Sequence, residues 1–520
     1  MALQATSQAA AIGAAAQNVQ FAPSAQNLAR KIVVIGTYDP SKTLVTDEVP
    51  IQVTSPADAG DKFGFGYMLH RLVKYAFAGS DGVECWCVPQ SEPSGAQAAG
   101  TITFADTTAQ AGTLYLYIAG ELVQVAITKN MADTALATAT AAAINANTDL
   151  PVTAAVNGVT AEQVDITAKT EGAYGNEIAI TLNENFGEAL PTGMTAVIVD
   201  MSGGSGTPTI ADALDGLGTG DDANEQFFTD LVHGYLQDTT TLDAISAYVG
   251  EGNVFTALYA KTVSRPFRAL TGDTATGSAG LTAIKAVGDA RKLDRANGVI
   301  CVPGSPNHPS EIAALAIGIM AKTNNDRAAE SYIGKVLPGV IPGARGSDRW
   351  TSEYDNRDSA VKSGVSPTVV DNGAVVMQNV LSFYHPDSVP DDSNGYRSMR
   401  NLSIIQNILY NIRLNFSQEK WQGISIVDDV GEVGSDIDRE KARVVASVED
   451  DLIALAREFG NKAWLFSKAF TVDRIAAGGL VVIRPGGIGF NSTMPVILSG
   501  EGGILDTIVQ FDTSLAVLLA

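Results

Sequence analysis

The stretch Lys31-Ile32-Val33-Val34-Ile35-Gly36 is an apolar run with no polar interruption after its first residue. A short run of this kind is typical of a strand that is buried inside a sheet. Residues 61–78 follow with apolar side chains at helical spacing, and residues 83–88 are predicted to form the next strand. The order strand, helix, strand predicts the beginning of an α/β layer.

The α/β pattern resumes after residue 206. Predicted helices lie at 221–236, 281–293 and 310–322, and predicted strands lie at 254–259, 266–270 and 298–302. Residues 324–365 are polar and irregular, so they predict no further element of the layer.

A different pattern begins at residue 366. Residues 369–376 predict a hairpin, because Asn372-Gly373 at their centre suits a type I′ turn. Long helices are expected at 398–420 and 436–459, and strand-like runs follow at 480–484, 495–498 and 504–513. This part of the chain therefore predicts an α+β arrangement.

The middle of the chain has its own organisation. Residues 91–100 and 202–206 are rich in small residues and predict flexible linkers. Between them, two predicted hairpins flank an alanine-rich helix at 133–146. Residues 96–206 carry eleven acidic residues and two lysines, a net charge of −9. An acidic module between two linkers predicts an inserted, surface-facing α+β domain.

Together these patterns predict an α/β and α+β multidomain protein, in which an α/β core carries an inserted β-rich domain. The expected parts are an N-terminal arm (1–24), a discontinuous α/β core (25–95 and 207–365), the inserted acidic domain (96–206), a C-terminal α+β domain (366–503) and a C-terminal strand or arm (504–520).

Composition and charge exclude several classes of function. The chain has 520 residues and a net charge of −23, which disfavours binding to nucleic acid or to anionic membranes. No secretory signal is expected at the N-terminus, and the longest apolar run, 312–321, is about half a membrane span. Cys85, Cys87 and Cys301 are expected to be reduced core thiols, since no further metal ligands lie at a useful spacing.

No catalytic motif stands out. The four histidines, His70, His233, His308 and His385, lie far apart in the sequence. The loop at 302–306 follows a strand and precedes a helix, but it has no lysine and only one glycine, so it matches neither a dinucleotide nor a P-loop pattern. We expect no cofactor and no metal, and we do not expect an enzyme.

Four motifs in the middle segment resemble the inserted domain of tail sheath proteins of Mu-like bacteriophages. They are Tyr117-Ile118-Ala119-Gly120-Glu121, Ala142-Ala143-Ile144-Asn145-Ala146, Pro151-Val152-Thr153-Ala154 and the stretch Thr167–Ile178. Residues 31–40 and 395–421 are similar to the same family, so the resemblance spans nearly the whole chain.

The resemblance implies a structural subunit that stacks in six-fold rings around a tail tube. The C-terminal domain would be completed by strands exchanged between subunits, and contraction would drive the tube through the host envelope. The implied partners are further copies of the chain, the tail tube protein, and the baseplate and tail terminator proteins, with no nucleic acid and no membrane insertion. The implied location is the virion tail, assembled in the bacterial host cytoplasm.

Two sets of residues are candidates for assembly contacts. The arm strands would use Gln17, Val19, Phe21, Ile508, Val509 and Phe511, with flexible arm roots at 22–28 and 500–503. The predicted helix at 436–459 carries a basic run that would face the tube, made of Arg439, Lys441, Arg443 and Arg457. The alternative for this run is a solvated helix with i,i+4 ion pairs.

Three other functions remain open. A related contractile machine, such as an R-type bacteriocin or a secretion-system sheath, would be built from the same kind of subunit. An α/β enzyme with an accessory β domain would need a polar pocket for which the sequence supplies no motif. A secreted adhesin or surface-layer protein would fit the acidic composition but not the internal α/β layers.

Overall fold

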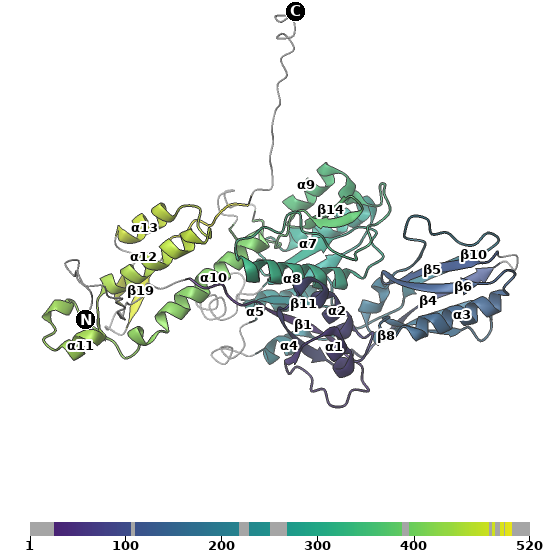
Figure 1. The fold of residues 1–520 in the computed structure, drawn as a ribbon, viewed down its shortest axis with the longest axis horizontal. Helices are drawn as coiled ribbons and strands as arrows, with labels where there is room; N and C mark the ends of the chain where they lie inside the picture. Colours follow the sequence, from purple (N-terminus) through teal and green to yellow (C-terminus); the bar gives the residue numbers. More distant parts are fainter. Residues whose placement is uncertain are drawn as a thin grey trace, which may run out of the picture. The chain divides into compact units, whose positions relative to one another are not determined.

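The computed structural model describes residues 25–105, 110–217, 228–249, 268–386, 395–477, 481–483, 489–492 and 494–501. The chain divides into two compact units. The larger unit contains the described residues between 27 and 407 together with residues 500 and 501, and the smaller unit contains residues 25 and 26 together with the described residues between 408 and 499 (Figure 1).

An eight-stranded sheet forms the core of the larger unit, in the order β15-β14-β13-β12-β11-β1-β3-β2. Six neighbouring strands are parallel: β1 (Lys31–Thr37), β3 (Glu84–Gln90), β11 (Asp230–His233), β12 (Arg268–Asp273), β13 (Asn297–Cys301) and β14 (Ser366–Asp371). β2 (Ile51–Val53) and β15 (Ala374–Met377) close the two edges as antiparallel strands. The predicted strand at 31–36 is thus confirmed as a central strand, with Ile32–Ile35 fully buried.

Helices connect and cover these strands. They are α1 (Pro56–Phe63), α2 (Met68–Ser80), α4 (Ile210–Gly216), α5 (Thr239–Val249), α7 (Gly277–Ala290), α8 (Pro309–Asp326) and α9 (Tyr354–Lys362), with a 3-10 turn η3 (Trp350–Ser352) before α9. α2 and α8 pack closely because two glycines face the partner backbone. A Cβ on Gly318 would lie 2.3 Å from the carbonyl oxygen of Ala76, and one on Gly79 would lie 2.4 Å from that of Leu315.

Residues 97–202 have a hydrophobic core of their own within the larger unit. Their elements are β4 (Gln97–Ala105), β5 (Gly112–Ile118), β6 (Glu121–Ile127), α3 (Asp133–Ala146), β7 (Val152–Val156), β8 (Gln163–Glu171), η1 (Ala173–Glu177), β9 (Ile180–Leu182) and β10 (Thr195–Ser202). The strands form two sheets, β10-β4-β8-β7 and β6-β5-β9, and α3 runs along them (Figure 1). We call residues 97–202 the acidic block. Both predicted hairpins and the alanine-rich helix are confirmed.

α10 (Met399–Phe416) begins in the larger unit and ends in the smaller one. The smaller unit continues with η5 (Glu419–Trp421), β16 (Ser425–Ile426), η6 (Val430–Glu432), α11 (Asp436–Lys441), β17 (Ala442–Arg443), α12 (Val445–Asn461), α13 (Lys468–Ala476), β18 (Val481–Ile483) and β19 (Phe490–Ser492). Its buried cluster consists of Val448, Leu452, Ala456 and Ile475, from α12 and α13.

Three predicted helices are wrong in part. Residues 230–233 form β11 and not a helix, because Leu231 and Val232 pair with β1 on one side and β12 on the other. The helix at 61–78 is broken between α1 and α2, where Gly64 and Gly66 adopt φ values of 93° and 82°. The helix at 436–459 is interrupted by β17, which pairs in parallel with β16.

The predicted linkers around the acidic block are paired with each other. Ala96 N–H donates to Ser205 O at 3.3 Å, and Ser205 N–H donates to Ala96 O at 3.1 Å. The two backbones approach so closely that a Cβ on Gly95 would lie 1.8 Å from Ser205 O. We call these paired residues, 95–96 and 205–206, the neck. The expectation of two flexible linkers is wrong for the neck, and β4 already starts at Gln97.

Candidate functional site

In open α/β sheets, ligands usually bind where the parallel strands end at their carboxyl edge. Here the chain leaves that edge after β3 to build the acidic block and returns to form α4 and β11. Tyr174 of the block lies buried at this edge, with its ring 3.9 Å from the ring of His308. The cavity that remains beside Tyr174 and Gly234 measures about 30 Å³. That volume holds a water molecule or two and no substrate.

His308 is a structural residue of this edge. Its Nε2–H donates to the carbonyl oxygen of Tyr174 at 3.0 Å, and its Nδ1 accepts from Ser310 N–H at 3.2 Å, which caps the start of α8. Burial lowers the pKa of His308 to about 3, so the ring is neutral at physiological pH. A neutral, fully occupied imidazole of this kind is fixed in place and is not free to shuttle protons.

A cluster of charged side chains lies where the acidic block meets α2 and α8. Arg71 of α2 makes a bidentate pair with Glu311 of α8, with N–O distances of 2.6 and 2.7 Å, and both side chains are fully buried. Arg71 also reaches Glu121 of the block at 2.9 Å. Lys74 completes the cluster through Glu121 at 2.8 Å and Asp149 at 3.0 Å. We call these five residues the charge cluster.

The charge cluster holds the block against the core. Burial alone would lower the pKa of Arg71, but the carboxylates of Glu311 and Glu121 raise it well above its usual value. Burial also works against the charge of Glu121, yet Arg71 and Lys74 bring its pKa below the ordinary range. Every charge is met by an opposite one, so the cluster has no free group for chemistry. Its evident role is to join two parts of the fold.

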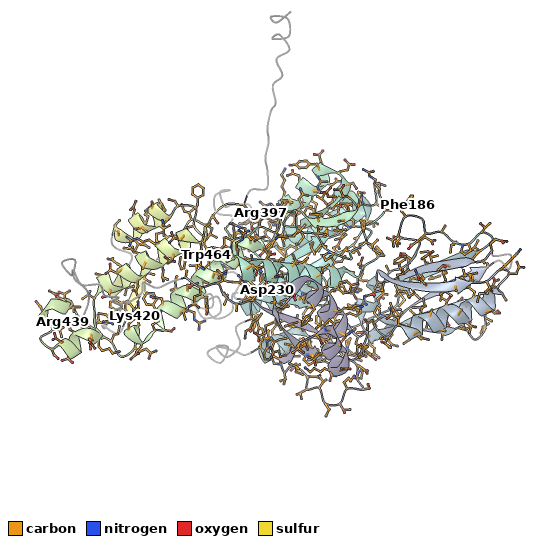
Figure 2. The ribbon with its side chains drawn as sticks, viewed as in Figure 1. Phe186, Asp230, Arg397, Lys420, Arg439 and Trp464 are labelled. Carbon is orange, nitrogen blue, oxygen red and sulfur yellow. The ribbon has the colours of Figure 1, made fainter. Side chains whose placement is uncertain are left out.

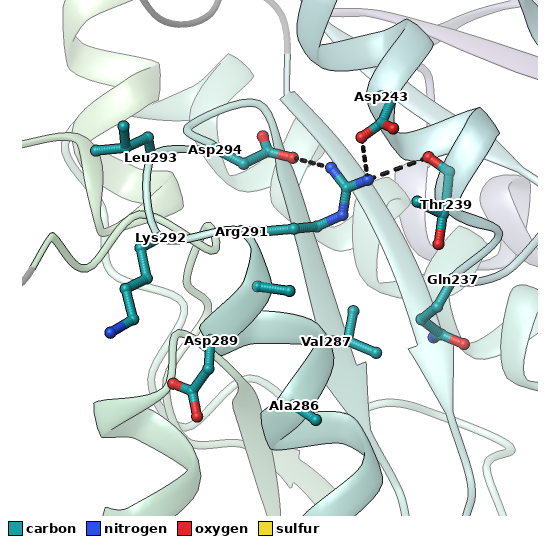
Figure 3. A pocket seen from close by; sticks show the side chains of 11 residues that line it. Gln237, Thr239, Asp243, Ala286, Val287, Asp289, Arg291, Lys292, Leu293 and Asp294 are labelled. Atoms are coloured by element: carbon teal, nitrogen blue, oxygen red, sulfur yellow. Dashed lines mark hydrogen bonds and ion pairs between the residues drawn. The ribbon is translucent and has the colours of Figure 1, made fainter.

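A surface depression with a volume of about 810 Å³ lies between α5 and the end of α7. Figure 3 shows Arg291 at its centre, where the guanidinium donates to Asp243, to Asp294 and to the carbonyl oxygen of Thr239. Because these three acceptors satisfy the guanidinium, the depression does not present a free cation to a ligand.

Neither a cluster of metal-ligating side chains nor a membrane-spanning helix is found among the residues that the structure describes. No group of three or more His, Cys, Asp or Glu side chains within those residues could hold a metal ion. None of the described helices combines the length and the apolar character needed to cross a bilayer. Cys85, Cys87 and Cys301 are free and buried, as predicted, and burial raises the pKa of Cys85 to about 12.

The predicted arm residues Gln17, Val19, Phe21, Ile508, Val509 and Phe511 lie outside the described residues. The roots of both arms are partly described, and these parts are anchored. Leu28 N–H donates to Asn407 Oδ1 at 2.8 Å. Glu501 accepts from the hydroxyls of Ser331 and Ser398. The expectation of flexible roots is therefore wrong for the described residues 25–28 and 501.

The residues of the predicted basic run lie on different elements, because β17 interrupts the predicted helix at 436–459. Arg439 lies on α11 (Figure 2) and pairs with Asp436 at 2.9 Å. Lys441 and Arg443 donate to backbone carbonyls of residues 419–422, and the Arg443 guanidinium lies 5.9 Å from the Trp421 ring centroid. Arg457 is exposed on α12. Lys441 and Arg443 thus stabilise the turn after α10, a role that the sequence did not indicate.

Comparison with known proteins gives one informative sequence relative. No protein-family model matches the chain. The Mu-like prophage FluMu tail sheath protein of Haemophilus influenzae is 26% identical over 397 residues, which cover 75% of this chain and 75% of that protein. The chain is similar to a Mu-like tail sheath protein. The resemblance inferred from the four motifs is thereby confirmed, and this relative is a structural protein and not an enzyme.

Solved sheath structures are also similar to this chain at lower identity. The sheath tail protein of Desulfitobacterium hafniense is 12% identical with a TM-score of 0.42, and the match covers 93% of this chain and 100% of that one. The contracted sheath of the PVC extracellular contractile injection system is 11% identical with a TM-score of 0.44, and the match covers 98% and 100% of the two chains.

Proposed function

We propose that this chain is the sheath subunit of a contractile, Mu-like phage tail. The observation that carries the proposal is the sequence relationship to a tail sheath protein over three quarters of both chains. The packing of Tyr174 against the carboxyl edge of the sheet agrees with it, because the cavity beside Tyr174 and Gly234 measures only about 30 Å³. In this proposal the subunits stack as six-fold rings around the tail tube and contract to drive the tube through the host envelope.

The proposed link between rings is strand exchange in the C-terminal domain. β18 and β19 pair only with each other among the described strands of the smaller unit. A two-stranded hairpin is marginally stable in water, and its outer edges offer unpaired main-chain groups. Strands from neighbouring subunits, formed by residues 17–21 and 508–511, would extend this hairpin by β-augmentation. The affinity of each added strand would come from main-chain hydrogen bonds worth about 0.5–1.5 kcal/mol each.

The acidic block is proposed to be an inserted, outward-facing domain. Its core is separate, its two backbone connections meet at the neck, and it carries a net charge of −9 over residues 96–206. In the assembled tail the partners would be further copies of the chain, the tube, and the baseplate and terminator proteins. Assembly would take place in the host cytoplasm.

Deletion of residues 1–20 tests the arm model. The truncated chain should fold, because the buried residues of the described cores begin at residue 25. It should not polymerise, because it lacks the strand that would be exchanged with a neighbouring subunit. Sedimentation and electron microscopy would measure polymer formation. A matched deletion of residues 1–10 keeps Gln17, Val19 and Phe21 and should polymerise normally. Normal polymers from the longer deletion would contradict strand exchange through this arm.

The proposed tube contact is best tested at Arg457. Lys441 and Arg443 bind backbone carbonyls, so reversing their charge would disturb the fold as well as any contact. Arg457→Glu changes an exposed side chain on α12. If α12 faces the tube, this variant should weaken assembly on isolated tubes and leave the unfolding temperature unchanged. Unaltered assembly on tubes would favour a solvent-facing role for this face of α12.

A further inference from the structure

Three asparagine-glycine pairs lie within the described residues, at 157–158, 297–298 and 372–373. Such a pair can deamidate without an enzyme when the main-chain nitrogen of the glycine attacks the side-chain carbonyl carbon of the asparagine. Glycine permits this attack because it has no Cβ and adopts conformations that other residues avoid. The asparagine side chain must rotate towards the nitrogen, so the hydrogen bonds that hold each amide control its reactivity.

The amide of Asn157 is held through both of its polar atoms. Its Oδ1 accepts from the N–H groups of Val159 and Thr160, each at 2.9 Å. Its Nδ2 donates to Asp165 Oδ2 at 2.8 Å. These bonds oppose rotation of the side chain, because each one reduces the fraction of time that the amide is free.

The amide of Asn297 is held inside the core of the larger unit. Asn297 is fully buried, and its Nδ2 donates to Leu242 O at 3.0 Å, to Ser246 Oγ at 3.1 Å and to Asp294 Oδ2 at 2.7 Å. Gly298 lies in the same strand, β13, which pairs with β12. The pair is therefore restrained and also shielded from the water that deamidation consumes.

Asn372 has none of these restraints. It lies with Gly373 at the exposed tip of the β14–β15 hairpin, where the two residues adopt φ values of 49° and 83°. Among the residues that the structure describes, neither the Asn372 side chain nor the Gly373 N–H has a hydrogen-bonding partner. A Cβ built on Gly373 would meet no atom within 4 Å, so the space around the glycine is open.

We propose that Asn372 is a site of spontaneous deamidation in the folded chain. Gly373 N forms a bond to Asn372 Cγ, the bond from Cγ to Nδ2 breaks, and Nδ2 leaves as ammonia with the proton from the Gly373 N–H. One water molecule then opens the cyclic succinimide. Opening at one carbonyl gives aspartate, and opening at the other gives isoaspartate. The turn must open briefly for the attack, and exposed hairpin tips are among the parts of a fold that open most readily.

Either product changes the hairpin. Aspartate adds a negative charge next to Asp371, and isoaspartate also adds a methylene group to the main chain of a two-residue turn. β15 is the edge strand of the eight-stranded sheet, where Val375 O and Met377 O accept from the N–H groups of Leu337 and Gly334. Isoaspartate is therefore expected to loosen this edge. The inference goes beyond the proposed function and does not depend on it.

Peptide mapping by mass spectrometry on the full chain tests the site. The folded chain is incubated in mildly alkaline buffer, and the conversion of each asparagine-glycine pair is followed with time. Asn372 should convert at least about tenfold faster than Asn157, as expected if the bonds to Asn157 keep its amide closed. In denaturant the pairs should convert at similar rates. Equal rates for Asn372 and Asn157 in the folded chain, or an Asn372 that does not convert, would overturn the proposal.

A variant tests the cause of the difference. Asp165→Ala removes the acceptor of Asn157 Nδ2, so Asn157 should convert several-fold faster while the Asn372 rate stays the same. Asn297 should remain slow in this variant, which shows that the core is still folded. An unchanged Asn157 rate would contradict control by hydrogen bonds. Asn372→Asp provides the reference for the aspartate product and should abolish the rapid release of ammonia by the folded chain.

Discussion

Arg71 and Glu311 show how single residues hold the larger unit together. Both are fully buried, from two helices that lie 240 positions apart in the sequence, and their two short hydrogen bonds match the planar shapes of guanidinium and carboxylate. Such a buried ion pair stabilises the folded state little more than an apolar pair would. Removing one partner is costly, however, because the other charge then remains unpaired in the core.

Arg71→Met is therefore expected to destabilise the larger unit by about 3–5 kcal/mol, measured by denaturant unfolding. The double variant Arg71→Met/Glu311→Leu removes both charges and should recover a large part of that loss. Lys322→Met, which breaks a partly exposed pair with Asp326, should cost less than about 1 kcal/mol. An Arg71→Met variant as stable as Lys322→Met would show that the buried pair has no structural role.

His233 gives the stability a predictable pH dependence. Its side chain is fully buried at the end of β11, where Nδ1 accepts from Tyr235 N–H at 3.2 Å. Burial lowers its pKa to about 4, whereas the unfolded chain has a histidine pKa of about 6.5. Between these values the unfolded state binds one more proton. His233 therefore makes the folded state less stable as the pH falls from about 6.5 to about 4.

His233→Asn keeps an acceptor near Tyr235 and removes the titrating group. The free energy of unfolding of the variant should fall less steeply with decreasing pH, by up to about 1.4 kcal/mol per pH unit within this window. The measurement is denaturant unfolding of both proteins at several pH values between 4 and 7. Parallel curves for the two proteins would show that His233 is not buried as a neutral ring.

At the scale of elements, strong periodicity predicted structure well. The bounds of α3 agree with its predicted range, and the β14–β15 hairpin turns at Asn372 and Gly373, with φ values of 49° and 83°. α9 was missed because Ala360 is its only buried residue, so it has almost no apolar stripe. β11 was taken for a helix because the apolar residues between Phe227 and Tyr235 recur at helical spacing in the sequence. These failures come from weak local signals that tertiary pairing overrides.

The neck is an element whose pairing is not predicted by its amino-acid composition. Small residues at 95–96 and 205–206 indicate flexibility, but here they allow two backbones to pair. Gly95→Ala would place a Cβ 1.8 Å from Ser205 O, so the strands of the neck must separate. We expect a loss of about 1–3 kcal/mol and faster proteolysis at the neck, both measured on the purified chain.

Gly158→Ala is the matched control for the neck. A Cβ at Gly158 would meet no atom within 4 Å, and the change should alter stability by less than about 0.5 kcal/mol. Equal proteolysis rates for the two variants would indicate a flexible connection in place of a paired neck.

At the scale of the whole molecule, the sequence predicted the α/β core and the family resemblance better than the sites. Arg71, Glu121, Asp149 and Glu311 lie in four distant parts of the chain, and no local pattern predicts that they meet. The asparagines of α10 were visible at i,i+4 spacing. Their partners at 26 and 28 lie 385 and 379 positions away, which only the fold reveals. The sequence predicted the basic run from its charges, but it did not predict the contacts that these side chains make.

The central claim is that this chain polymerises as a tail sheath. Negative-stain electron microscopy of the purified full-length chain tests it most directly. The account predicts hollow, striated cylinders, formed by the chain alone or on added tail tubes. Discrete particles of single-subunit size under both conditions would contradict it.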